Sequence, residues 1–225
     1  MSLPKPAGAV QNHAMALTYD RGQKFLFIGD SITDCGRRED PEKIGHGYVR
    51  MIRDYLYAKD PARAPSVINT GISGNKVTDL QARWKTDVLD HEPDVVSIKI
   101  GINDVWHGLG DRKNGVPIEQ FVDVYHVILR QLHAVLPNAK LVLCQPSVIW
   151  PPAPAEGNAV LQPYVRAVKE LRREFNAVAV VPLHAAFVNA QTARPDINWA
   201  PDGVHPSSAG HMLIARTWLA ETGLL

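Results

Sequence analysis

The stretch FLFIGDSITD, residues 25–34, joins an apolar run to a polar turn and decides how the rest of the chain is interpreted. Residues 25–28 form a short apolar run that is rich in aromatic side chains, which is typical of a buried strand. The run ends at Gly29-Asp30-Ser31, and two interpretations of Ser31 are open. Residues 31–34 have the S-x-x-D form of a helix capping box. Alternatively, Ser31 is a nucleophile at a strand-to-helix turn, where the helix N-terminus favours negative charge.

Four similar runs follow along the chain and predict four more strands: Ser66–Asn69, Val95–Ile100, Leu141–Cys144 and Val178–Val181. The segments between them show helical periodicity over residues 77–88, 118–135, 161–175 and about 206–220. Strands that alternate with helices predict a parallel sheet covered on both faces. We therefore expect an α/β fold, a three-layer α/β/α sandwich with a five-stranded parallel sheet in flavodoxin-like strand order. In such sheets ligands bind at the carboxyl ends of the strands.

Composition limits the classes of function. The chain has 225 residues, of which 45% are hydrophobic and 21% charged, as in a single globular domain. Its formal net charge is +1 and its basic residues do not cluster, so neither nucleic-acid nor membrane binding is expected. Residues 1–20 lack the apolar core of a secretory signal and predict a flexible N-terminal arm, ahead of one domain over 21–225. Cys35 and Cys144 do not indicate a disulfide scaffold, so the expected location is cytoplasmic.

Polar residues also follow the second and third predicted strands. Gly74 ends the string Gly71-Ile72-Ser73-Gly74, and Asn103 lies in Gly101-Ile102-Asn103-Asp104. Ordinary turn chemistry and helix capping explain each string taken alone. However, a glycine lets its N–H approach a bound oxyanion closely, and a carboxamide N–H is a second good donor.

The last informative segment is the loop Pro201-Asp202-Gly203-Val204-His205-Pro206. An aspartate three residues before a histidine can orient the imidazole and leave its Nε2 as a base. Taken alone, this spacing is equally typical of a surface turn. Together with Ser31, Gly74 and Asn103, this loop supplies all the parts of a site for nucleophilic catalysis: a nucleophile, a base, an orienting carboxylate and oxyanion donors. We therefore predict a catalytic triad of Ser31, His205 and Asp202.

These blocks resemble those of the SGNH hydrolase superfamily, also called GDSL esterases and lipases. The resemblance covers the chain from Lys24 to the C-terminus. It implies that Ser31 is the nucleophile, His205 the general base and Asp202 its partner. It also implies an oxyanion hole made by the amides of Ser31 and Gly74 and the side chain of Asn103. The longer strings FIGDSITDCGR, GHGYV, GISGN, IGINDVWHG and VHPSSAGHMLIAR are similar to bacterial acetylxylan esterases.

That branch implies a serine esterase that removes O-acetyl groups from carbohydrates, such as xylo-oligosaccharides, through an acetyl-enzyme. The expected partner is a small acetylated sugar or another short-chain ester, without a metal or cofactor, and the branch suggests a homo-oligomer. Ile32 stands where the GDSL string has leucine. Pro201 precedes the triad aspartate where relatives have a bulkier residue, which leaves the substrate range open.

Asp30, Trp106 and Trp199 are the candidate substrate-binding residues. Trp106 fits core packing and a sugar-stacking platform equally well, since aromatic side chains serve in both. Cys35 is interpreted as a structural thiol, because the sequence suggests no histidine partner for it.

Two other functions remain open. A lysophospholipase or acyl thioesterase of the same superfamily would use the same triad, although no long apolar lid is evident. A flavodoxin-like binding module without catalysis is the more remote alternative, because Asp30 and Asp34 beside Ser31 would repel a phosphate dianion.

Overall fold

Five parallel strands form the sheet at the centre of the computed structural model, which describes residues 16–154 and 156–225. The strands are β1 (Lys24–Gly29), β2 (Ser66–Asn69), β3 (Val95–Lys99), β4 (Lys140–Cys144) and β5 (Ala179–Val181). Their spatial order is β2-β1-β3-β4-β5, and β1 pairs with β2 on one side and β3 on the other. This order is the flavodoxin-like one, and the predicted fold class is confirmed.

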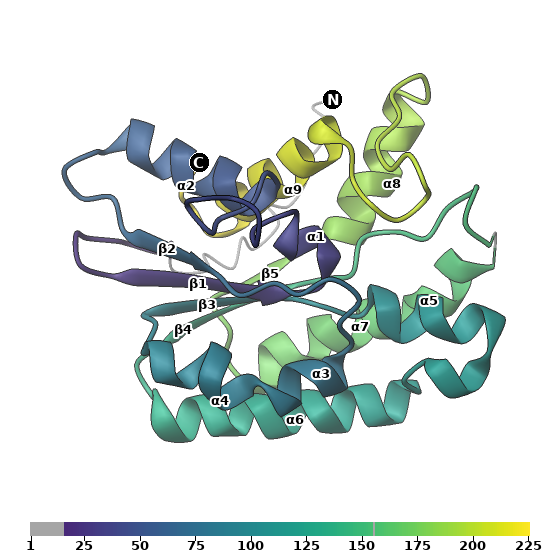
Figure 1. Cartoon of the computed structure of the whole chain (residues 1–225), viewed down its shortest axis with the longest axis horizontal. Helices are drawn as coiled ribbons and strands as arrows, with labels where there is room; N and C mark the ends of the chain where they lie inside the picture. Colours follow the sequence, from purple (N-terminus) through teal and green to yellow (C-terminus); the bar gives the residue numbers. More distant parts are fainter. Residues whose placement is uncertain (1–15, 155) are drawn as a thin grey trace, which may run out of the picture.

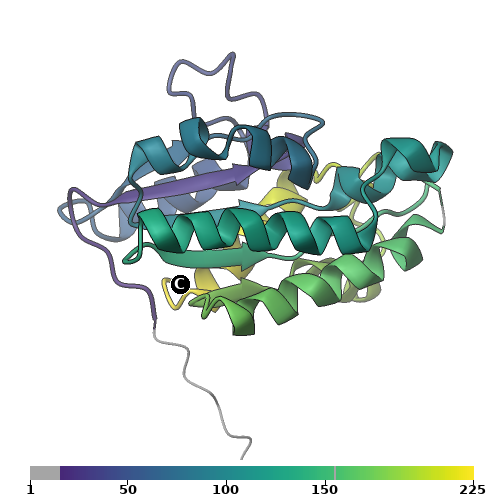
Figure 2. The same cartoon turned by 90° about the horizontal axis from the view of Figure 1, so that it is seen from below.

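Helices cover both faces of the sheet, so the structure has three layers (Figure 1). One outer layer contains α1 (Ser31–Asp34), α2 (Tyr48–Lys59), α8 (Leu183–Ala193) and α9 (Ser208–Glu221). The other contains α3 (Val77–Ala82), α4 (Trp84–Asp87), α5 (Ile102–Gly110), α6 (Ile118–Val135) and α7 (Gly157–Glu174). Of two short 3₁₀ turns, η1 (Leu89–His91) lies between α4 and β3, and η2 (Arg112–Asn114) lies between α5 and α6. Figure 2 shows α6 and α7 lying side by side across their face of the sheet.

Strand β1 shows why its sequence is apolar at nearly every position. Successive side chains of a strand point to opposite faces, and both faces of this strand are covered. Phe27 packs against Tyr48 of α2, with ring centroids 6.0 Å apart, and against Trp218 of α9 at 5.3 Å. Leu26 and Ile28 are also fully buried. The strand is thus held centrally, and the turn after it is presented at the carboxyl edge of the sheet.

Three details of the helices differ from the sequence-based expectation. Helices α2 and α8 were not predicted; in α8 only Leu183 and Phe187 are buried, so its periodic signal is weak. The helix expected over 77–88 is broken at Arg83 into α3 and α4. For the last helix the sequence pattern predicts Met212, Leu213 and Leu219 on the apolar side; in α9, however, Met212 is exposed and Trp218 is buried.

Two residues of the predicted N-terminal arm contact the domain. Residues 1–15 of the predicted arm lie outside the described residues. Leu17, however, is buried, and its N–H donates to the carbonyl of Thr222 at 2.8 Å. Tyr19 meets Phe25 edge to face, with ring centroids 6.4 Å apart. Leu17 and Tyr19, which lie before the predicted boundary at residue 20, therefore have partners in the domain.

Within residues 16–154 and 156–225, none of the helices combines the length and apolarity needed to cross a bilayer.

Candidate active site

The turn after β1 presents Ser31 at the carboxyl edge of the sheet. Helix α1 begins at Ser31, and its N-cap is Asp30, whose Oδ1 accepts a hydrogen bond from the Ile32 amide at 2.9 Å. The capping interpretation of Ser31 is therefore wrong, because the neighbouring aspartate performs that role. The Ser31 hydroxyl is instead hydrogen-bonded to His205, with Oγ 2.8 Å from Nε2.

His205 is oriented by Asp202 in the loop before α9. The His205 Nδ1 lies 2.6 Å from Asp202 Oδ2, and the other carboxylate oxygen accepts from the amides of Val204 and His205 at 2.9 and 2.7 Å. Burial would raise the pKa of Asp202. The hydrogen bonds from the His205 ring and from the two amides outweigh that effect and lower this pKa below its usual value. An ionised Asp202 keeps the proton of the ring on Nδ1, so Nε2 can accept a proton from Ser31.

Gly203 allows this loop to lie close to the backbone of Trp150. Its φ is +86°, and a Cβ at this position would lie 1.9 Å from the carbonyl oxygen of Trp150. The Trp150 amide donates to the Gly203 carbonyl at 2.9 Å. A side chain here would displace the segment between Asp202 and His205.

The segment with Gly74 lies between the nucleophile turn and α5. Asp34 of α1 accepts from the amide and hydroxyl of Ser73 at 3.1 and 3.0 Å. On the other side, the Asn103 side-chain amide donates to the carbonyl of Asn75 at 3.0 Å. The structure therefore brings together the loop of Gly74, the first turn of α5 and the turn of Ser31. A carboxamide has two N–H groups, so Asn103 can also donate to a bound oxyanion.

Arg83 and Asn69 support this arrangement, and sequence reasoning missed both. Arg83 donates to the carbonyl of Thr70 at 2.6 Å and to that of Gly29 at 3.2 Å, which ties together the ends of β2 and β1. Asn69 donates to the carbonyl of Thr33 at 2.7 Å. The available signals were an arginine that interrupts an apolar helical pattern and an amide that ends a strand.

Asp30, which the sequence predicts as a substrate-binding residue, is buried. Its side chain is 1% exposed and lies 3.9 Å from Nζ of Lys99, which is itself fully buried. Burial lowers the pKa of Lys99, while the Asp30 carboxylate raises it in part. The carboxylate of Asp30 is thus enclosed in the interior, where it caps α1 and lies beside Lys99.

The two tryptophans lie in different places. The Trp106 ring is half-buried beside the triad, with its centroid 6.1 Å from that of His205. The indole of Trp199 donates to the carbonyl of Arg194 at 3.1 Å, and its own carbonyl accepts from Ser207 at 3.0 Å. Trp199 thus stabilises the connection between α8 and α9, and Trp106 is the aromatic side chain that borders the histidine.

Cys35 has a histidine neighbour that the sequence did not suggest. Its Sγ lies 3.6 Å from Nε2 of His211, whose Nδ1 accepts from the Tyr48 amide at 3.2 Å. Burial raises the pKa of the thiol and lowers that of His211 to about 4. Both groups are therefore neutral near pH 7, and the pair is not a thiolate nucleophile with its base.

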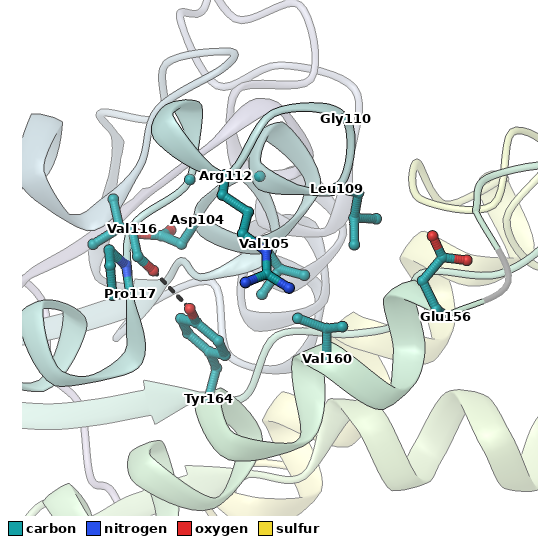
Figure 3. Close-up of a pocket in the computed structure, with 12 residues that line it drawn as sticks. Asp104, Val105, Leu109, Gly110, Arg112, Val116, Pro117, Glu156, Val160 and Tyr164 are labelled. Carbon is teal, nitrogen blue, oxygen red and sulfur yellow. Dashed lines mark hydrogen bonds between the residues drawn. The ribbon is translucent and has the colours of Figure 1, made fainter.

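A cavity of about 670 Å³ lies between α5, the segment after it and α7 (Figure 3). Its walls are mainly apolar, and Tyr164 donates to the Val116 carbonyl at 2.6 Å. The residues of the triad and the predicted oxyanion hole are not among those that line it. Asp104 is at its inner wall, 1% exposed, and accepts from the Val77 amide at 3.0 Å. Asp104 therefore holds the start of α3 against α5.

Asp104 gives a prediction on stability and pH. Burial raises its pKa to about 7, although the Val77 amide opposes this in part. The folded chain thus keeps a proton that the unfolded chain has lost between about pH 4 and pH 7, so the free energy of unfolding falls as pH rises through that window. Over the whole window the free energy of unfolding falls by about 4 kcal/mol. We expect Asp104→Asn to lose less stability than the wild type between pH 5 and pH 8, measured by urea unfolding.

The control is Asp123→Asn, because Asp123 is exposed on α6. This variant should follow the pH dependence of the wild type. Equal pH dependence in Asp104→Asn and wild type would contradict the assignment of Asp104 as a buried acid.

Comparisons with known proteins agree with this fold. The profile of the GDSL-like Lipase/Acylhydrolase family matches residues 27–213. An acetylxylan esterase of Geobacillus stearothermophilus is 42% identical over 217 residues, which cover 90% of this chain and 94% of that protein. The crystal structure of Axe2, an acetylxylan esterase from that organism, matches with a TM-score of 0.81 at 36% identity, covering 92% of this chain and 97% of the other.

A candidate GDSL-like lipase from Parabacteroides merdae matches with a TM-score of 0.87 at 35% identity, covering 93% of this chain and 100% of the other. The family match spans most of the described domain. The alignment with the acetylxylan esterase covers nearly the whole length of both proteins. The chain therefore belongs to the GDSL-like lipase/acylhydrolase family and is a carboxylic ester hydrolase.

Proposed function

We propose that this esterase removes O-acetyl groups from carbohydrates, most naturally xylo-oligosaccharides, with Ser31 as nucleophile, His205 as general base and Asp202 as its partner. The observation that carries the proposal is the continuous hydrogen-bonded chain from Ser31 Oγ through His205 to Asp202, with distances of 2.8 and 2.6 Å. A neutral imidazole held in this way makes an otherwise weak hydroxyl nucleophile reactive.

The reaction proceeds in two steps. The Ser31 oxygen attacks the acetyl carbonyl while its proton passes to Nε2 of His205. The amides of Ser31 and Gly74 and the side chain of Asn103 stabilise the oxyanion. His205 then protonates the sugar oxygen as its bond to the acetyl carbon breaks, leaving acetyl-Ser31. His205 then takes a proton from water as the water oxygen attacks this ester. The bond between the acetyl carbon and Ser31 Oγ breaks, acetate leaves, and His205 returns the proton to Ser31.

Three observations support the proposal: two concern a sugar ester as substrate, and one concerns the triad. The curated relative is an acetylxylan esterase, and catalytic mutants of Axe2 have been solved in which a serine, an aspartate or a histidine is replaced by alanine. The same three residue types form the chain of hydrogen bonds here. In addition, the Trp106 ring next to His205 offers a flat face on which a sugar can stack.

The experiment that tests this proposal is release of acetate from acetylated xylo-oligosaccharides, run beside 4-nitrophenyl acetate and 4-nitrophenyl esters of longer acids. We expect rapid release from the sugars and a fall in kcat/KM as the acyl chain grows. A preference for long acyl chains would reject the deacetylase in favour of a lysophospholipase or thioesterase. Hydrolysis of the aryl acetate alone would reject the sugar substrate and retain the esterase.

Trp106 gives a prediction on substrate binding. We expect Trp106→Ala to raise KM for acetylated xylo-oligosaccharides by about tenfold, because a stacking surface worth about 1 kcal/mol and some burial are lost. KM for 4-nitrophenyl acetate should change less. Steady-state kinetics on both substrates measures the difference, and an equal loss on both would reject the platform.

The control for Trp106 is Trp199→Phe, which keeps an aromatic ring in the α8–α9 connection. It should leave both KM values within about twofold of wild type. A larger rise in the sugar KM for Trp199→Phe than for Trp106→Ala would move the platform to Trp199.

A further inference from the structure

A shallow groove adjoins the triad on the α5 side. It has a volume of about 590 Å³ and is lined by Lys76, Trp106, His107, Gly110, Asp111 and Asn114, and we call it the Trp106 groove. Trp106 connects the groove with the triad, since its ring is the neighbour of the His205 ring. The groove therefore borders the histidine that would protonate the leaving sugar.

The lining of the Trp106 groove favours one kind of ligand. It offers one aromatic face, one cation, one carboxylate, an amide and an imidazole. The opposite charges of Lys76 and Asp111 do not select an anion, and Trp106 is the single large apolar side chain in the lining, so an acyl chain has little to pack against. Neutral rings with many hydroxyl groups fit best, because they stack on an aromatic face and exchange hydrogen bonds with mixed donors and acceptors.

The walls of the groove are connected to each other and to the oxyanion side. Lys76 Nζ donates to the carbonyl of Asn114 at 3.1 Å, which joins the start of α3 to the turn after α5. The backbone N–H of Asn114 donates to the carbonyl of Asp111 at 2.9 Å. Lys76 directly follows Asn75, whose carbonyl accepts from Asn103. The groove is thus held in a constant position relative to Ser31 and His205, which lowers the entropic cost of binding.

We propose that the Trp106 groove binds the sugar units on the leaving-group side of an acetylated oligosaccharide, and that the enzyme acts on short chains in preference to single sugars. This inference rests on the proposed function. His205 Nε2 must reach the leaving oxygen, so the acetylated sugar lies at His205. A second sugar unit then stacks on Trp106, and a further one meets His107 and Asn114.

A second groove, on the other side of the Asp202 loop, provides the matched control. Its volume is about 480 Å³, and Gln191, Asn198 and Ala200 are among the residues that line it. Asn198→Ala removes an amide from that groove as Asn114→Ala does from the Trp106 groove. The two variants therefore distinguish which side of the triad binds the chain.

The test compares kcat/KM for acetate release from acetylated xylotetraose and acetylated xylose in wild type, a His107→Ala/Asn114→Ala double variant and Asn198→Ala. We expect the wild type to prefer the tetraose by about tenfold or more. The double variant should lose about tenfold of that preference through KM, since each lost hydrogen bond is a factor of roughly 3 to 10. Asn198→Ala should retain the wild-type ratio.

The outcomes separate the two proposals. Two results would overturn the proposal that the Trp106 groove binds the sugar chain and would leave the proposed deacetylase activity standing. One is equal rates on tetraose and xylose in the wild type, and the other is loss of the preference in Asn198→Ala instead of the double variant. Hydrolysis of 4-nitrophenyl acetate without acetate release from either sugar would overturn the proposed function. Calorimetric titration of Ser31→Ala with unacetylated xylotetraose tests the groove without catalysis, and the His107→Ala/Asn114→Ala changes in that background should weaken binding about tenfold.

Discussion

Replacement of Ser31 by alanine should lower kcat by about 10⁴-fold or more while the fold is retained. The hydroxyl is the group that His205 contacts at 2.8 Å, and no acyl-enzyme can form without it. The effect on stability should be small, because the loss of one half-exposed hydrogen bond costs about 1 kcal/mol or less. Steady-state kinetics on 4-nitrophenyl acetate, with circular dichroism and thermal unfolding of the same samples, measures both effects.

A covalent probe locates the nucleophile independently. An aryl fluorophosphonate should add once to the wild type, and peptide mass spectrometry should place the adduct on Ser31. Ser66→Ala is the control, since Ser66 is an exposed serine at the beginning of β2, the amino end of that strand. Ser66→Ala should be labelled and active like wild type. A folded Ser31→Ala enzyme that retains more than about one hundredth of the wild-type kcat would exclude Ser31 as nucleophile.

Replacement of Asp202 by asparagine should lower kcat by about 10⁴-fold, with a much smaller change in KM. The carboxamide in Asp202→Asn would have nearly the same shape as the carboxylate but could donate to Nδ1, which favours the tautomer with its proton on Nε2. That tautomer cannot accept the proton of Ser31. The carboxylate would also no longer stabilise the imidazolium formed in each step. Kinetics on 4-nitrophenyl acetate from pH 5 to pH 9 measures this loss.

The pH dependence adds a second check on Asp202. Its pKa is below the usual value in the folded chain, so the hydrogen bonds to it contribute stability above the pKa of the unfolded state and lose it as pH falls through the folded pKa. The Asp202 carboxylate of the wild type should therefore stay ionised at a lower pH than an ordinary aspartate. Asp123→Asn is again the matched control and should retain wild-type kcat. A loss of less than about tenfold in Asp202→Asn would exclude this carboxylate as the partner of His205.

Most of the fold could be predicted from the sequence because its strands are short, apolar and regularly separated by helical patterns. The five predicted strands differ from the observed ones by at most one residue at either end. The misses occur where local pattern and tertiary contact disagree. Arg83 breaks a helix because its guanidinium bonds the carbonyls of Thr70 and Gly29, and a pattern of apolar residues contains no trace of those contacts.

The candidate site divides in the same way. Its residue types follow from chain order, since the carboxyl ends of parallel strands meet at one edge of the sheet. Ser31, His205 and Asp202 could thus be named before any distance was known, and their catalytic roles stay predictions until the variants are measured. Burial could not be inferred, because it depends on what packs over a side chain. Asp30 looked like a ligand-binding carboxylate, yet it lies in the interior beside Lys99.

By itself the sequence determined the order of the elements, the layered fold and the residue types at one edge of the sheet, because local periodicity and strand direction suffice for these. Tertiary structure alone decided which neighbour caps α1, that His211 lies beside Cys35 and that the Trp106 groove borders His205. Each of these depends on contacts between residues far apart in the chain or on the direction of a single side chain. Such contacts are set by close packing of the whole domain, which no short stretch of sequence specifies.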